Sequence, residues 1–114
     1  MEGSPSYVVE ITPDAEKYYL QLLSYLYGTH TPSSADEKAK AVLDMAMSLS
    51  THPNRGRIED ELSYLNKGHR FLVYPYSDRN TIKVIYFVEE GTKKVYVTDF
   101  FPSEKDPSKI KRRA

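Results

Sequence analysis

The chain has 114 residues, a length typical of one domain with a single hydrophobic core. Its 16 basic and 16 acidic side chains cancel, which argues against a protein that binds polyanions indiscriminately. It has no cysteine, so disulfide bonds, thiolate nucleophiles and cysteine-type zinc sites are excluded.

The charge is spread unevenly along the chain. Residues 1–50 carry three basic against seven acidic side chains, a net −4, and residues 51–114 carry thirteen against nine, a net +4. The second part can therefore attract a local anionic partner. No run approaches the roughly 20 apolar residues that a membrane-spanning helix needs, and the opening MEGSPS lacks the apolar segment of a signal peptide. We therefore expect a cytoplasmic protein with no membrane segment.

The first predicted elements are a strand and a helix. Residues 7–11, YVVEI, are mostly β-branched or aromatic, which is typical of a strand. Thr12 can cap a helix, and Pro13 suits its first position. Apolar residues then recur at helical spacing up to Gly28, a common helix terminator.

A second helix follows a polar hinge at residues 29–33. Ser34 and Glu37 have the spacing of a capping box, in which each side chain binds the backbone amide of the other residue. The helix has to end before Pro53. One helical face collects small and apolar side chains, namely Ala39, Val42, Ala46 and Leu49. We expect the two helices to form an αα-hairpin.

Three strand candidates fill the second half of the chain. Residues 54–67 are predicted as a loop with a short turn at 61–65, and strands follow at 70–76, 81–88 and 94–101. The short turns between these strands favour an antiparallel meander. The basic residues that follow are expected to form a solvated, mobile tail.

The predicted order is β-α-α-β-β-β, an α+β fold in which a helical hairpin packs on an antiparallel sheet in two layers. We assign residues 1–114 to one domain, with a core of about 7–102 and a basic tail at 103–114. Alternation along the central strand places Ile82 and Val84 against the helices and Lys83 on the other face. Since both faces are largely apolar, we expect a partner segment to cover the second one.

Several stretches, taken in order, point to a known family. The chain opens with YVVEITPDAEKYYLQLLSYL, and its second helix ends in SLSTHPNRGR. GHRFLVYPY and IKVIYFVEEGTKKVYVTDFF then supply the strands. Their sequence and spacing resemble the RelE/ParE superfamily of toxins from bacterial type II toxin–antitoxin systems, over residues 7 to about 107, and the ParE-like branch is favoured.

The resemblance implies a plasmid-stabilisation-like toxin that a cognate antitoxin neutralises. Members either inhibit DNA gyrase or cleave messenger RNA on the ribosome, so gyrase and the ribosome with its messenger RNA are the candidate targets. A further alternative is a non-toxic protein of the same fold that serves as a binding module. No cofactor is expected.

The ribonuclease branch needs groups that take and give protons, and cations that offset the charge on the phosphate. By resemblance, the set would be Arg57, Arg70, Lys83 and Lys105. Lys83 stands where the family has an arginine, and a lysine lacks the bidentate fork of arginine. Phe101 stands where the family often has a histidine, and no tyrosine follows it. These departures favour a toxin that acts by binding over an enzyme.

The candidate residues for binding the target or a nucleic acid are Arg55, Arg57, Arg70 and Lys83. Arg57 matches an arginine that the family keeps between the second helix and the sheet. We favour a structural bridge to a helix end or to the acidic residues at 59–61, with contact to an anionic partner as the alternative. Arg55 is expected to be a plain surface residue. The three histidines lack a metal-binding spacing, so no metal site is predicted.

Overall fold

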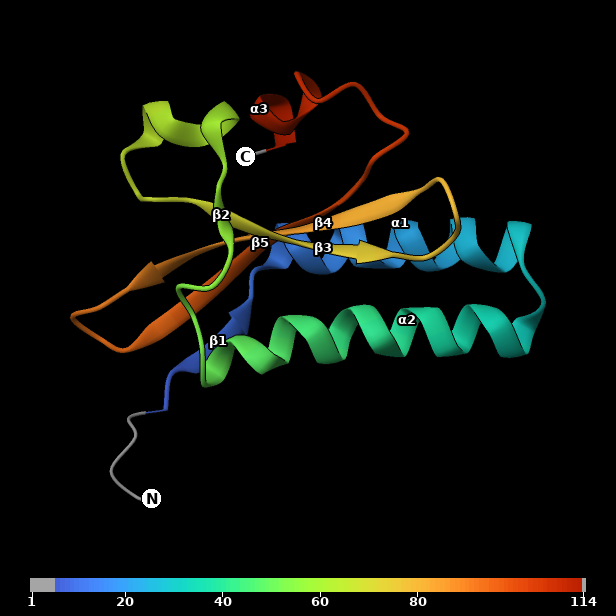
Figure 1. Ribbon diagram of the computed structural model, residues 1–114, viewed down its shortest axis with the longest axis horizontal. Helices are drawn as coiled ribbons and strands as arrows, with labels where there is room; N and C mark the ends of the chain where they lie inside the picture. Colours follow the sequence, from blue (N-terminus) through green and yellow to red (C-terminus); the bar gives the residue numbers. More distant parts are fainter. Residues whose placement is uncertain (1–5, 114) are drawn as a thin grey trace.

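Five strands form one open sheet in the order β1-β5-β4-β3-β2, and two long helices pack on it (Figure 1). The computed structural model describes residues 6–113. In chain order the elements are β1 (Val8–Ile11), α1 (Pro13–Thr29), α2 (Pro32–Met47), the 3-10 helix η1 (Ser48–Ser50), β2 (Arg57–Ile58), the 3-10 helix η2 (Asp60–Leu65), β3 (Arg70–Pro75), β4 (Thr81–Glu89), β5 (Lys94–Pro102) and α3 (Lys109–Arg113).

The predicted antiparallel meander is confirmed by β3, β4 and β5. The central strand β4 pairs Lys83 with Val73 on one side and with Phe101 on the other. β1 pairs in parallel with β5, which the sequence pattern did not reveal. A parallel pair needs a long connection, and here the helical hairpin and two strands of the meander supply it. The architecture is the expected α+β fold.

Both long helices begin at a Thr-Pro pair. Thr12 caps α1 by accepting a backbone amide of the first turn at 3.1 Å, with Pro13 in the first helical position, as predicted. In α2 the cap is Thr31, whose Oγ1 accepts the Ser34 amide at 3.2 Å, and Pro32 comes next. The prediction of a capping box at Ser34 is therefore wrong, because an equivalent start signal lies three residues earlier.

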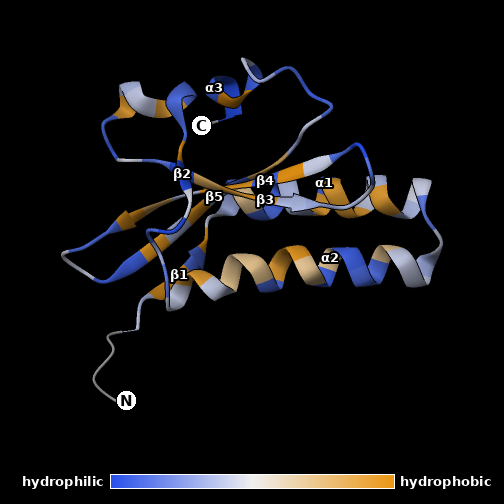
Figure 2. Cartoon of the chain, in the orientation of Figure 1, coloured by the Kyte–Doolittle hydropathy of each residue, from blue (hydrophilic) through white to orange (hydrophobic). Residues whose placement is uncertain are grey.

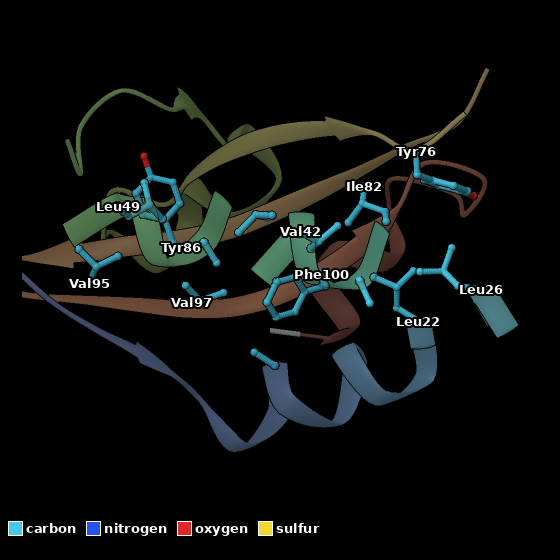
Figure 3. Close-up of a cluster of buried hydrophobic side chains, with 14 of the residues drawn as sticks. Leu22, Leu26, Val42, Leu49, Tyr76, Ile82, Tyr86, Val95, Val97 and Phe100 are labelled. Atoms are coloured by element: carbon cyan, nitrogen blue, oxygen red, sulfur yellow. The ribbon is translucent and has the colours of Figure 1, made fainter. Parts of the chain in front are cut away.

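The main core lies between the sheet and the helical hairpin (Figure 3). Ile82 and Val84 of β4 are fully buried there, in a cluster that also contains Leu22, Leu26 and Val42. The predicted register of the central strand is thus confirmed. Burying each large apolar side chain contributes about 1.5–3 kcal/mol, so this cluster is the main source of stability.

The second face of the sheet is covered by the chain's own C-terminal residues. Ile110 of α3 is only 1% exposed and packs with Leu62 of η2, Ile85 and Phe101. Figure 1 shows α3, in red, on the side of the sheet opposite α2. The expected solvated tail is therefore wrong at Ile110. The expected partner segment is not needed over this part of the sheet, because α3 and η2 already cover it.

An ion pair fixes α3 to the sheet. Arg113 Nε and Nη2 donate to the two carboxylate oxygens of Asp99 at 3.0 and 2.6 Å, and both side chains are largely buried. Such a bidentate pair combines charge with directed hydrogen bonds. The tail was expected to be solvated, because nothing in the basic run KIKRR shows that Arg113 has a buried partner 14 residues earlier in the chain.

Hydrophobic residues concentrate on the strands and on parts of the helices, and the turns between strands are hydrophilic (Figure 2). Across residues 6–113, no helix is both long and apolar enough to cross a membrane. The same part of the chain gathers no group of three His, Asp or Glu side chains suited to holding a metal ion.

Candidate functional site

A two-residue strand, within a stretch predicted as loop, forms the outer edge of the sheet. β2 pairs Arg57 with Phe71 and Ile58 with Arg70 of β3. From Leu72 onward, β3 has no further strand beside it on this side within residues 6–113. The backbone of this open edge can therefore accept a strand from another chain.

Gly56 fixes the loop that leads into β2. Its backbone N–H donates to the Tyr86 hydroxyl at 3.0 Å. A Cβ at this position would lie 2.6 Å from that hydroxyl oxygen and 2.7 Å from the Phe71 carbonyl oxygen. Only glycine allows so close an approach, which explains the glycine between the two arginines Arg55 and Arg57.

Arg55 and Arg70 hold the same loop from two sides. Arg55 Nη2 donates to the Ser48 hydroxyl at 2.6 Å, and its Nη1 donates to the Ser48 carbonyl at 3.4 Å. Arg70 Nη1 donates to the Gly56 carbonyl at 2.8 Å. Arg55 therefore lies on the surface, as expected, and in addition bridges the loop to the end of α2.

Arg57 is an exposed cation on β2. It makes no hydrogen bond or ion pair through its side chain with any of residues 6–113, so its predicted structural bridge is wrong. The reason is that Arg55 already reaches the end of α2, while pairing with Phe71 places the Arg57 side chain on the second face of the sheet, away from the helical hairpin. Contact with an anionic partner remains its predicted role.

Lys83 lies on the second face of the sheet, as predicted, and forms an ion pair there. Its Nζ is 3.0 Å from Glu59 Oε1 and 4.2 Å from the centre of the Phe71 ring. Glu59 is 3% exposed and Lys83 is 28% exposed. The other Glu59 oxygen accepts the Glu61 amide at 3.1 Å and caps η2. The sequence pattern gave no sign of this partner, because the two residues are 24 positions apart.

A shallow cavity of about 400 Å³ lies at the edge of the sheet formed by β2 and β3. It is lined by Arg55, Gly56, Arg57, Phe71, Leu72 and Val73. Lys83 joins this surface through its contact with the Phe71 ring. We call residues 55–57 and 71–73 together with Lys83 the edge surface. It combines an open strand edge with positive charge.

Lys105 does not join the edge surface. It lines a different cavity, beside Tyr18 and Tyr25 of α1. By strand alternation, Arg57 and Lys83 lie on the same face as Phe71. Arg70 lies on the opposite face, with its guanidinium on the Gly56 carbonyl. Lys105 lies apart from all three, so the set expected for a ribonuclease is not assembled. The position of Lys105 follows from the turn after β5, which the sequence pattern could not orient.

Besides Glu59, which is buried and paired with Lys83, the side chains of His69 and Tyr86 lie beside the edge surface and could exchange a proton, and both are buried. His69 is 4% exposed, and its ring contacts that of Phe87 with centroids 5.1 Å apart. Burial lowers the pKa of His69, and the positive charge of Lys67 lowers it further. The Tyr86 hydroxyl is held by Gly56, and burial raises the pKa of Tyr86. Neither side chain is placed to protonate a leaving group on the surface.

The chain matches a known protein family. A family model described as the ParE toxin of type II toxin-antitoxin system, parDE, covers residues 9–107. This range runs from β1, through the whole edge surface, to the connection that leads into α3. No curated protein shows significant similarity to the chain. Because the match spans most of the sequence, the chain belongs to the ParE toxin family of type II toxin–antitoxin systems, in which an antitoxin is the partner, and the resemblance to the RelE/ParE superfamily is confirmed.

Proposed function

We propose that this toxin inhibits growth in the cytoplasm by binding a protein target through the edge surface. The observation that carries the proposal is Arg57, an exposed cation with no side-chain partner among residues 6–113, beside the open edge of β3. An extended segment of the target can pair with the backbone of β3 while an acidic side chain meets Arg57. DNA gyrase is the first candidate target, since the ParE-like branch of the superfamily inhibits it.

A toxin that acts by binding is favoured over an enzyme, because the side chains that could exchange a proton are buried or lie elsewhere. General acids and bases typically contribute about 10²- to 10⁴-fold each to an enzymatic rate. His69 and Tyr86 are buried, and Lys105 lines another cavity. Glu59 is buried and paired with Lys83. The edge surface therefore offers cations that can hold an anion, while its nearby proton-exchanging groups are buried or already paired.

A ribosome-dependent ribonuclease is the second candidate, and one observation favours it. Arg57 is the cross-strand partner of Phe71, and the Lys83 ammonium lies over the Phe71 ring. Two cations around an aromatic ring can hold a nucleotide through its phosphate and its base. In that case Lys83 and Arg57 would position messenger RNA on the ribosome.

Inducible expression tests the proposed function. The wild-type chain should arrest growth, and co-expression of its antitoxin should restore it. Arg57→Glu should relieve the arrest because it reverses the charge of the edge surface. Arg79→Glu reverses an exposed charge in the β3–β4 turn and should remain toxic. The control for folding is the urea midpoint, which should be the same for Arg57→Glu and the wild type. A variant with the wild-type midpoint and full toxicity would contradict the proposal.

Gyrase supercoiling by the purified enzyme then identifies the target. The wild-type toxin should inhibit supercoiling, and Arg57→Glu should inhibit it at least about tenfold less, as expected for the loss of a central interfacial charge. Growth arrest without inhibition of supercoiling would exclude gyrase and direct the search to another protein target.

A further inference from the structure

A second cavity lies between α1 and the connection from β5 to α3, and it shares no lining residue with the edge surface. Its volume is about 330 Å³, at the lower end of the roughly 300–1,000 Å³ that small-molecule sites occupy. Leu22, Phe100 and Pro102 supply apolar walls, and Tyr18 and Tyr25 add aromatic ones. The lining favours a ligand with an apolar body.

Contacts with neighbouring side chains hold both tyrosines in place. The Arg113 guanidinium stacks on the Tyr18 ring at 3.9 Å from its centre, and the Arg113 carbonyl accepts the Tyr18 hydroxyl at 3.2 Å. The ring of Tyr25 meets that of Tyr76 edge to face, with centroids 6.4 Å apart. The walls are therefore preformed, which reduces the entropy lost on binding.

Three charged side chains line this cavity, and two of them already have partners. Arg113 donates to both carboxylate oxygens of Asp99 at 2.6 and 3.0 Å. Glu104 Oε2 accepts the Tyr76 hydroxyl at 2.6 Å. Lys105 is exposed, and its ammonium makes no hydrogen bond or ion pair with any of residues 6–113. One uncommitted positive charge thus stands at the rim of an apolar cavity.

We propose that this cavity binds an organic carboxylate with an apolar body. The body fills the space beside Leu22 and Phe100, and the carboxylate pairs with Lys105 at the rim. A cationic ligand fits worse, because Lys105 and Arg113 are both positive and the single carboxylate of the lining, Glu104, is already hydrogen-bonded. Charge-assisted hydrogen bonds are roughly twice as strong as neutral ones. The proposal does not depend on how the toxin acts at the edge surface.

An NMR titration of the full chain with 3-phenylpropionate, a small carboxylate with an aromatic body, tests the proposal. We expect saturable shifts of backbone amides at residues 18–25 and 100–105, with none at residues 55–57. The uncharged 3-phenylpropanamide should bind about tenfold more weakly, because it loses the charged contact.

Two sources could supply such a ligand, namely a small free acid and the C-terminal residue of a polypeptide. N-acetylphenylalanine carries the peptide bond that distinguishes the second source. Tighter binding of N-acetylphenylalanine than of 3-phenylpropionate identifies a polypeptide C-terminus, and weaker binding identifies a small acid. Either order of the two affinities supports the site, provided that the NMR shifts fall on the residues that line the cavity.

Substitutions at the rim complete the test. Lys105→Gln should weaken binding of 3-phenylpropionate about tenfold, and Lys105→Arg should preserve it. Lys109→Gln removes an exposed lysine at the start of α3 that does not line the cavity, and should bind like the wild type. The proposal is overturned if 3-phenylpropionate gives no saturable shifts, if the amide binds as tightly as the acid, or if Lys105→Gln binds as tightly as the wild type.

Discussion

At Gly56 the backbone passes so close to its neighbours that no side chain fits. In Gly56→Ala the new Cβ would stand 2.6 Å from the Tyr86 hydroxyl oxygen and 2.7 Å from the Phe71 carbonyl oxygen, so the loop has to shift. We expect the free energy of unfolding to fall by about 1–3 kcal/mol, measured by urea denaturation.

Gly28 is the matched control for this substitution. It lies in the last turns of α1, and a Cβ there would meet nothing within 4 Å. Gly28→Ala should leave the stability unchanged or raise it by up to about 1 kcal/mol. A Gly56→Ala variant as stable as Gly28→Ala would show that the loop is not held as tightly as its contacts indicate.

His69 makes stability depend on pH. Burial and then Lys67 lower its pKa below the ordinary value, and Glu59 opposes this to a lesser degree. Since the unfolded chain binds the proton more readily, the stabilisation is complete above about pH 6.5 and is lost as the pH falls toward the folded-state pKa. The urea midpoint should therefore decrease between pH 7.5 and pH 5.

His69→Gln isolates this contribution because glutamine does not titrate. The variant should show a flatter dependence of the urea midpoint on pH than the wild type, whatever its absolute stability. His52→Gln removes an exposed histidine and should keep the wild-type slope. Equal slopes for His69→Gln and the wild type would show that another group causes the effect.

The roles of the two arginines beside Gly56 could not be predicted from the sequence. The sequence indicated that Arg57 would brace the helix end and that Arg55 would be plain surface. Both arginines are exposed, and it is Arg55 that reaches the helix end at Ser48. Which of Arg55 and Arg57 reaches Ser48 depends on the path of the loop. That path is set by the contact between Gly56 and Tyr86, 30 residues apart in the chain, which no local pattern encodes.

At the scale of elements, the start of α2 offers a direct test of capping. Thr31 Oγ1 accepts the Ser34 amide, while the Ser34 hydroxyl makes no capping bond among the described residues. Thr31→Ala should lower the free energy of unfolding by about 1 kcal/mol. Ser34→Ala should change it by less than about 0.5 kcal/mol. A larger loss of unfolding free energy in Ser34→Ala than in Thr31→Ala would show that Ser34, and not Thr31, caps the helix.

The terminal helix α3 is short, yet its packing indicates that it belongs to the folded core. Ile110 is fully buried against Leu62, Ile85 and Phe101. Ile110→Ala should cost about 2–4 kcal/mol. Lys109→Ala, at an exposed neighbouring position, should change stability by less than about 0.5 kcal/mol. Matching urea curves for the two variants would mean that the tail adds nothing to stability.

The long elements were predictable from the sequence, and so was the short strand β1, but β2 and α3 were not. The two helices and the meander carry enough periodic residues to be recognised, whereas β2 has two residues and α3 has five. So short a segment has no measurable period, and its structure comes from tertiary contacts. This is why residues 57–58 were predicted as loop and Ile110 as part of a tail.

In the whole molecule, the two faces of the sheet are covered by different parts of the chain. The helical hairpin covers one face, and η2 with α3 covers much of the other (Figure 1). Alternation along β4 predicted that both faces are apolar, but it could not tell whether the cover comes from the same chain or from a partner. Because the chain itself covers much of both faces, a partner is expected to bind at the edge formed by β2 and β3, where the backbone of β3 is open.

The central claim is that this ParE-family toxin acts by binding and not by cutting RNA, and mapping messenger RNA ends on translating ribosomes tests it most directly. The measurement is made during growth arrest, with the wild type and with Lys83→Ala. We predict arrest without discrete cuts at the codon in the ribosomal decoding site, because His69 and Tyr86 are buried and Lys105 lies elsewhere. Discrete cuts in the wild type that vanish in Lys83→Ala would contradict the account and establish the ribonuclease.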